Sequence, residues 1–111
     1  MSEASQELAE RLRACFGHRP GITEKRMIGG ICFMDHGNML VGVTKAGALL
    51  ARVGPARYRE AQSRPGAAPM EMGGREMTGF VAVTDEGIES DEALLDWISY
   101  AEEFVQTLPP K

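Results

Sequence analysis

Two cysteines and two histidines, Cys15, His18, Cys32 and His36, are the residues of this sequence with the chemistry of transition-metal ligands. Thiolate and imidazole groups are the ligands that zinc prefers, but structural zinc sites place them at short, regular spacings. The spacing in this sequence matches no zinc finger or zinc ribbon. Both cysteines also fall at apolar positions of the elements expected around them. We therefore predict that they are core residues and that the chain binds no metal and no other cofactor.

Catalytic groups are equally hard to assemble from the sequence. Cys32 and His36 could form a nucleophile and its base, but no third residue is supplied to orient the imidazole. The carboxylates concentrate in residues 85–92, at an expected turn and helix start, where they satisfy backbone donors and the helix dipole. A carboxyl group must be buried before its pKa suits acid–base catalysis. We predict that the protein is not an enzyme.

Two arginines, Arg26 and Arg52, stand in segments that otherwise read as apolar strands. Two hypotheses stay open for Arg26. It either pairs with an acidic group at a subunit boundary, or it lies free in a groove and grips a carboxylate or phosphate with two parallel hydrogen bonds. Gly29 and Gly30 would edge such a groove, because glycine has no side chain to block a ligand. For the glycines we favour the alternative, a β-bulge or a helix packed closely over the strand.

The densest basic cluster follows Arg52 and contains Arg57, Arg59 and Arg64. It is most simply the solvated face of a short helix, and the alternative is a small contact patch for nucleic acid or for an acidic protein. The formal net charge of −4 argues against broad nucleic-acid binding, which depends on many contacts from Lys and Arg to phosphates. Only a weak, auxiliary contact with nucleic acid is expected.

Three helices are predicted. The first covers residues 3–16, with Ser2 as its N-cap and Gly17 at its end. The second is short, covers residues 55–62 and has a proline in its first turn. The third begins after Ser90 and has the strongest helical periodicity of the chain. Its apolar stripe contains Leu94, Trp97, Ile98, Ala101, Phe104, Val105 and Leu108.

Five strands are predicted in two groups. The first group is a meander of three apolar runs, separated by turns that contain glycine or asparagine. The second is a hairpin that turns at Gly73 and Gly74, and it follows a loop over residues 65–69. The order helix, three strands, helix, two strands, helix predicts an α+β domain with a five-stranded antiparallel sheet. The strands of the meander are expected within residues 24–34, 39–44 and 48–53.

Both faces of the meander carry apolar side chains. Residues 24–34, taken as one strand, place Arg26, Cys32 and Met34 on one face and Ile31 and Phe33 on the other. A sheet that is covered on one side only should alternate apolar and polar residues. The second face must therefore be covered as well, either by helices split across both faces or by a second copy of the chain. We predict a homodimer.

The bulk properties indicate one soluble domain over residues 1–111. Hydrophobic residues make up 43% of the chain and charged residues 25%, as in ordinary globular proteins. The N-terminus lacks the basic and apolar regions of a signal peptide. No apolar run approaches the roughly 20 residues that a membrane helix needs. We expect a cytoplasmic protein with no membrane contact.

The start of the meander, Lys25-Arg26-Met27-Ile28-Gly29-Gly30, resembles the N-terminal domain of the TfoX (Sxy) family of bacterial competence regulators. That family opens with Arg-Met-Phe-Gly-Gly or a close variant. Ile28 stands where phenylalanine is common, Arg52 stands where lysine is common, and the acidic residue often found soon after that lysine is missing. The segment Ser90-Asp91-Glu92-Ala93-Leu94-Leu95-Asp96-Trp97 is also similar to the family, and the resemblance spans roughly residues 5–107.

This resemblance implies a two-layer α+β fold in which helices pack on a five-stranded antiparallel sheet, similar to secretion-chaperone-like folds. Full-length TfoX proteins act as transcriptional co-regulators, so the resemblance implies a non-catalytic regulatory module that contacts another protein. The alternatives are a small-ligand protein that binds a carboxylate or phosphate, and an auxiliary DNA-contacting domain. The candidate interaction residues are Arg26, Gly29, Gly30, Arg52, Arg57 and Arg59.

Overall fold

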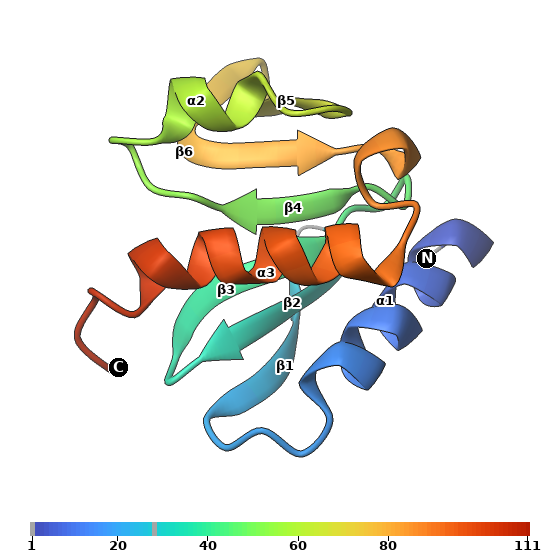
Figure 1. The fold of residues 1–111 in the computed structure, drawn as a ribbon, viewed down its shortest axis with the longest axis vertical. Helices are drawn as coiled ribbons and strands as arrows, with labels where there is room; N and C mark the ends of the chain where they lie inside the picture. The colour runs from blue at the N-terminus through green and yellow to red at the C-terminus, as the bar shows by residue number, and fades with distance from the viewer. Residues whose placement is uncertain (1, 28) are drawn as a thin grey trace.

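The computed structural model describes residues 2–27 and 29–111 of the chain. Ten elements follow one another, and Figure 1 shows three α-helices packed against one sheet. They are α1 (Glu3–Phe16), β1 (Ile22–Met27), β2 (Gly30–Asp35), β3 (Asn38–Val43), β4 (Leu49–Arg52), α2 (Tyr58–Gln62), β5 (Ala67–Met72), β6 (Arg75–Val83), the 3-10 turn η1 (Asp85–Gly87) and α3 (Asp91–Val105).

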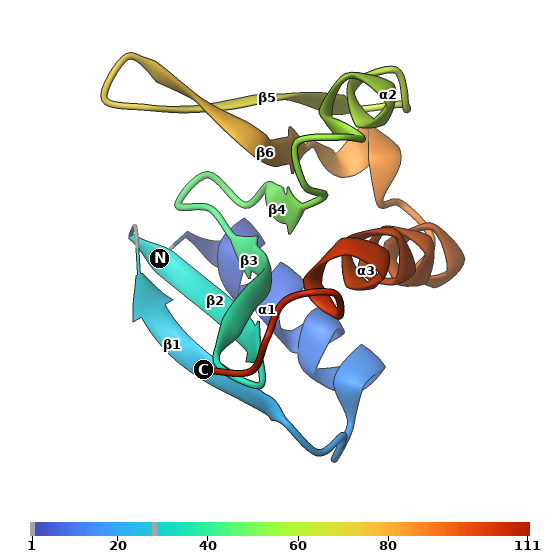
Figure 2. The same cartoon turned by 90° about the vertical axis from the view of Figure 1, so that its left-hand side faces the viewer.

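The sheet is antiparallel throughout, with the strand order β1-β2-β3-β4-β6-β5. The pairing of β4 with β6 joins the N-terminal four strands to the C-terminal hairpin. All three helices lie on one side of the sheet, as Figure 2 shows. The predicted α+β class is confirmed, but the sheet has six strands where we predicted five.

The additional strand comes from the N-terminal part of the meander. Residues 24–34 were predicted as one strand, but the chain reverses within them and forms the hairpin of β1 and β2. Gly29 has a φ of +75°, a left-handed conformation that glycine adopts without strain. The apolar residues on both sides of the turn hide it in the sequence. Ile28, which we expected inside the strand, lies outside the described residues.

The hairpin also changes the face on which Arg26 lies. Arg26 pairs directly with Ile31 across the two strands, so both side chains point to the helix-covered face of the sheet. We predicted that Arg26 shares a face with Cys32 and Met34, and that prediction is wrong because the turn resets the alternation. Glu24 lies on the same face as Arg26 and accepts two hydrogen bonds from Arg13 of α1, at 2.9 and 2.8 Å.

The other differences from the predicted elements are small and have simple causes. Residues 65–69 were expected to be a loop, but β5 begins at Ala67 and contains Pro69. Proline is tolerated there because β5 is an edge strand, where a missing N–H leaves no neighbouring carbonyl unpaired. Helix α2 is shorter than predicted and starts only at Tyr58.

The starts of the two long helices were predicted correctly from their caps, although α3 ends at Val105 and leaves Leu108 of the predicted stripe beyond it. Ser2 accepts a hydrogen bond from the Ser5 N–H at 3.1 Å, and Ser90 accepts one from the Ala93 N–H at 3.0 Å. These side chains satisfy backbone donors that a helix start leaves open. The main core forms between these helices and the sheet, and its largest fully buried side chains include Leu12, Phe33, Leu40, Leu49, Ile88 and Leu94.

The second face of the sheet is buried by a different arrangement. Cys32, Met39 and Leu50 form a separate cluster there and are only 2%, 9% and 3% exposed, although no helix lies on this side. Side chains from both edge strands, Met27 on β1 and Met70 on β5, pack against this cluster. We infer that the sheet curls around the cluster, because no helix covers these buried side chains and their cover comes from side chains of the sheet itself. Met34 and Phe80 complete the cluster, which we call the methionine cluster.

Both cysteines lie in apolar surroundings, as predicted. Cys32 is buried in the methionine cluster, and Cys15 is partly buried against the main core. Burial raises the pKa of each thiol, so both stay protonated and unreactive at neutral pH. None of the described helices has the length and apolar character needed to cross a lipid bilayer.

The fold makes a specific prediction about Gly30. A Cβ placed on this residue would overlap the carbonyl oxygen of Val43 in β3, so Gly30→Ala should force the strands apart. We expect the free energy of unfolding to fall by about 3 kcal/mol, the upper range for overpacking. Urea denaturation measures this.

Gly73→Ala is the matched control. A Cβ on Gly73 would meet nothing within 4 Å, although its φ is +58°. The left-handed backbone should cost only about 1 kcal/mol there. Equal losses for the two variants would contradict the close packing of Gly30.

A candidate interaction surface of arginine and aromatic side chains

The residues proposed from the sequence as one groove lie in different settings. Arg26 is exposed and lines a cavity of about 240 Å³ between α1 and β1, together with Glu10 and Arg13. Gly29 and Gly30 do not line that cavity. Gly29 forms the hairpin turn, and Gly30 gives the backbone of β3 room to approach. Both glycines therefore have structural explanations, but these are a hairpin turn and a close contact between strands, and not the β-bulge or closely packed helix that we favoured.

Arg52 has a packing role at the end of β4. Its guanidinium carbon lies 5.6 Å from the ring centre of Phe80 and 5.7 Å from that of Phe104. One guanidinium N–H points to the carbonyl oxygen of Met39 at 3.5 Å, the long limit for a hydrogen bond. Arg52 thus fills the space between two aromatic rings, and its half-buried guanidinium is held by residues of its own chain.

The basic cluster predicted after Arg52 is organised around one aromatic ring. The guanidinium carbons of Arg57 and Arg64 lie 3.6 and 3.9 Å from the ring centre of Tyr100 on α3. Both distances are too short for the two groups to share one face, so the ring lies between them. Arg64 also lies 5.1 Å from the ring centre of Trp97. We call Arg57, Arg64, Trp97 and Tyr100 the arginine–aromatic cluster.

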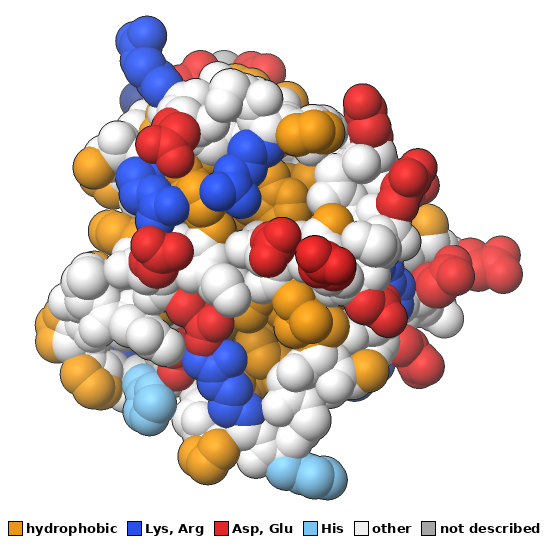
Figure 3. Space-filling model, viewed as in Figure 1, with side chains coloured by type: hydrophobic (Ala, Val, Ile, Leu, Met, Phe, Trp, Pro, Cys, Tyr) orange, Lys and Arg blue, Asp and Glu red, His pale blue; other side chains and the backbone are white. Residues whose placement is uncertain are grey.

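Local sequence explains why these residues meet. Trp97 and Tyr100 are three residues apart in α3, so they project from the same side of the helix, with ring centres 5.8 Å apart in an edge-to-face arrangement. Tyr58 and Ala61 anchor α2 in the core, and the proline at position 65 follows Arg64 directly. Figure 3 shows Arg and Lys side chains on either side of hydrophobic groups above α3.

Carboxylates complete part of this surface. Arg57 donates a hydrogen bond to Glu103 at 3.2 Å, and the Tyr100 hydroxyl donates one to Glu60 at 3.1 Å. In contrast, no carboxylate of the described residues lies within ion-pair distance of Arg64. Arg64 is half-buried by the rings beneath it, and its N–H donors remain available to a partner. Cation–π stacking therefore holds this guanidinium in place while leaving its hydrogen-bonding capacity unused.

Arg59, the remaining predicted residue, lies beside this cluster and not in it. It is exposed and lines a shallow cavity of about 520 Å³ with Gln62 and Glu76. The sequence indicated the arginines but missed Trp97 and Tyr100 as their partners. The available signal was their spacing of three residues in α3, but we assigned Trp97 to the core stripe and gave Tyr100 no role.

The other candidate groups of the sequence lie apart from this surface. Within residues 2–27 and 29–111, no three His, Cys, Asp or Glu side chains are placed to bind one metal ion. His36 Nδ1 lies 2.7 Å from the Asp35 carboxylate, in the turn between β2 and β3. Cys32 lies in the methionine cluster on the helix-free face of the sheet.

The hydrogen bond from Tyr100 to Glu60 generates a prediction about alkaline stability. Burial raises the pKa of Tyr100, the hydrogen bond to Glu60 raises it further, and the Arg57 charge lowers it in part. The folded state holds the Tyr100 proton more tightly than the unfolded state does. The protonated hydroxyl therefore makes its full contribution to the free energy of unfolding below the ordinary tyrosine pKa. That contribution is lost as the pH rises through the higher pKa of the folded protein.

We therefore expect the free energy of unfolding to fall between about pH 9 and about pH 12, and to fall less steeply in Tyr100→Phe. Denaturant unfolding at each pH measures both slopes. Tyr58→Phe is the comparison variant, since burial also raises the pKa of Tyr58. A Tyr100→Phe slope equal to that of the wild type would contradict a raised pKa of Tyr100 in the folded protein.

Comparison with known proteins identifies the family of the chain. The model of the TfoX N-terminal domain family matches residues 14–105, a range from the end of α1 to the end of α3. Comparisons with curated proteins and with solved structures gave no match. Because the family match covers most of the chain and all six strands, the protein belongs to the TfoX N-terminal domain family.

Proposed function

We propose that this domain is a non-catalytic interaction module that acts in the cytoplasm and in a regulatory setting. Its partner is a second protein that presents a carboxylate-bearing segment to the arginine–aromatic cluster. Membership of the TfoX N-terminal domain family supports a TfoX-like module. The single observation that carries the choice of surface is Arg64, whose guanidinium is stacked on Trp97 and Tyr100.

The stacked geometry suits recognition of a carboxylate. A guanidinium that is already held on two rings loses less conformational freedom on binding than a freely rotating one. Tryptophan, tyrosine and arginine are also the residue types that contribute most binding energy at protein interfaces. A glutamate or aspartate of the partner can therefore form two parallel hydrogen bonds with Arg64.

The same surroundings favour a protein over a nucleic acid. Glu60 and Glu103 lie inside the arginine surface and would repel the regular phosphates of a polynucleotide. The net charge of −4 opposes long-range attraction to DNA as well. A partner that presents a single carboxylate can contact Arg64 without bringing further negative charge close to Glu60 and Glu103.

The test uses as the probe a capped hexapeptide with one glutamate among glycine and serine residues, and it measures the affinity by an NMR titration of the full chain. Arg64→Ala should weaken binding about tenfold, the value of one charge-assisted hydrogen-bonded pair. Arg64→Lys should recover only part of this loss, because lysine keeps the charge but not the planar stack. The matched control is Arg75→Ala, which removes an exposed arginine from β6.

Equal affinity of the wild type and Arg64→Ala for the peptide would reject the proposed surface. The second arm replaces the peptide with a short DNA duplex. Tighter binding of the duplex that depends on Arg64 and falls steeply with salt would show that the surface serves nucleic acid instead.

The proposal includes a homodimer that forms through the helix-free face of the sheet. The curl of the sheet already buries the centre of that face, so covering the centre does not by itself require a second copy. The rim of the face supports the proposal, because Met34, Met70 and Phe80 stay only partly buried. Met72, two residues after Met70 in β5 and so on the same side, is 37% exposed.

Met72→Glu should therefore weaken the dimer about tenfold or more, since it places a charge in an apolar contact. Leu95→Glu is the matched control: Leu95 is 46% exposed but lies on α3, on the opposite side of the sheet. Size-exclusion chromatography with light scattering at several micromolar concentrations measures the dimer. A wild-type monomer, or equal weakening by both substitutions, would contradict this part of the proposal.

A further inference from the structure

A second polar site lies at the C-terminal end of α3. A cavity of about 320 Å³ opens between the turn after β2, the segment after α1 and the end of α3. This volume is at the lower end of the range for small-molecule pockets. Apolar walls of the cavity come from Pro20, Val105, Leu108 and Pro110, and its polar groups come from Arg19, Asp35, His36, Asn38 and Gln106.

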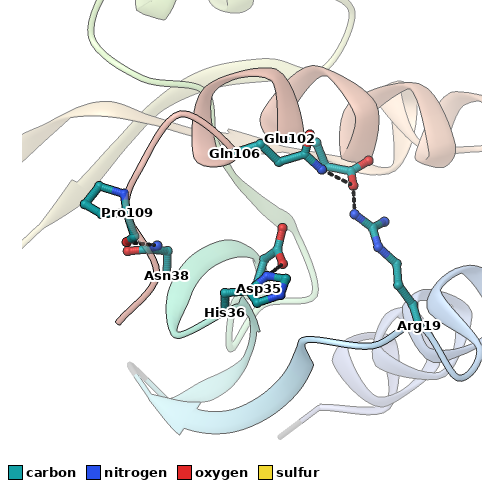
Figure 4. Close-up of polar contacts among 7 residues, drawn as sticks. All are labelled: Arg19, Asp35, His36, Asn38, Glu102, Gln106 and Pro109. Atoms are coloured by element: carbon teal, nitrogen blue, oxygen red, sulfur yellow. Dashed lines mark hydrogen bonds and ion pairs between the residues drawn. The ribbon is translucent and has the colours of Figure 1, made fainter.

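Asp35 is the unusual residue of this cavity. Its side chain is only 7% exposed, yet an ionised carboxylate offers about four acceptor positions. Among the described residues it has one hydrogen-bond partner, Nδ1 of His36 at 2.7 Å. Figure 4 shows the other carboxylate oxygen of Asp35 pointing away from His36, toward the end of α3. This second oxygen keeps its contact with solvent through the cavity, where a ligand with hydrogen-bond donors can reach it.

The nearby cation does not neutralise this oxygen. Arg19 forms an ion pair with Glu102, and Gln106 donates a further hydrogen bond to the same glutamate at 3.4 Å. Figure 4 shows Arg19, from the segment after α1, directed to Glu102 on α3 and not to Asp35. The charges of Arg19 and Glu102 cancel each other, so Arg19 does not offset the charge of Asp35.

The end of α3 adds to this negative potential. The helix ends at Val105, and its last carbonyl groups carry the negative end of the helix dipole at the cavity wall. The rim is also held in place on both sides. Asn38 donates from its side chain to the Pro109 carbonyl at 2.9 Å, and the Lys111 N–H donates to the His36 carbonyl at 2.8 Å. The acceptors are therefore arranged before any ligand arrives.

We propose that this cavity binds a small aliphatic primary amine, whose ammonium group donates to the free oxygen of Asp35 and whose carbon chain lies against Val105 and Leu108. An ammonium group supplies the positive charge and the hydrogen-bond donors that the second oxygen of Asp35 is missing from its surroundings. Because Val105 and Leu108 form an apolar wall, the cavity favours a ligand with an alkyl chain over a hydrated metal ion. This site is separate from the arginine–aromatic cluster and does not depend on the function proposed for it.

The test titrates n-butylammonium chloride into the full chain, at constant ionic strength, and follows the backbone amides by NMR. Saturable shifts are expected in residues 35–38 and 105–108. The equally long but neutral 1-butanol should produce no saturable shift at these residues. Asp35→Asn should weaken the binding of n-butylammonium at least tenfold, while Asp96→Asn, the same change at an exposed position of α3, should leave it unchanged.

A second variant keeps the test decisive if Asp35→Asn does not fold. Gln106→Lys changes an exposed residue and places an ammonium group of the chain itself at the cavity, so it should weaken binding at least fivefold. Unchanged affinity in this variant, unchanged affinity in folded Asp35→Asn, or equal binding of 1-butanol would each overturn the proposal.

Discussion

The whole structure depends on one constraint: a sheet with apolar side chains on both faces has helices on only one of them. The helix-covered face forms the main core with α1 and α3. The other face must hide Cys32, Met39 and Leu50 without a covering layer. It does so by curling, which brings methionines from both edge strands over the cluster. Methionine suits this task because its unbranched, flexible side chain fills irregular gaps.

On the helix-covered side of the sheet, α3 lies across the middle of the strands (Figure 1). One side of α3 faces α2 and carries Trp97, Tyr100 and Glu103. The other side faces α1 and the turn after β2, and carries Glu102 and Gln106. Both polar sites of the molecule therefore share one helix, and its packing on β3 and β4 positions them together.

The sequence predicted those elements whose signals are local. Ser2 and Ser90 mark helix starts that the structure confirms, and the Gly73-Gly74 turn lies where the hairpin of β5 and β6 reverses. The first hairpin was missed because β1 is an edge strand of mostly exposed, charged residues, and such a strand lacks the apolar alternation that marks a strand in a sequence. The start of β5 was missed because proline at position 69 reads as a loop residue, whereas an edge strand accepts it.

The candidate sites were less accessible to sequence reasoning, because each depends on contacts between distant segments. The arginines after Arg52 stood out by composition, but the ring between two of them is 36 residues beyond Arg64. Asp35 and Asn38 read as ordinary turn residues. Their burial follows from the end of α3 packing beside the turn, as the hydrogen bond from Asn38 to Pro109 shows. No short-range pattern encodes that contact.

The methionine cluster has a consequence for the behaviour of the protein under oxidative stress. Oxidants convert methionine to its sulfoxide, which is polar and less flexible in packing. Met34 and Met70 are only partly buried and lie on the face that no helix covers, so oxidants reach these side chains more readily than those of the buried cluster. Each sulfoxide would place a strong hydrogen-bond acceptor against the buried apolar cluster and loosen the packing of this face. Because methionine sulfoxide reductases reverse this damage, the shape of this face is tied to the redox state of its surroundings.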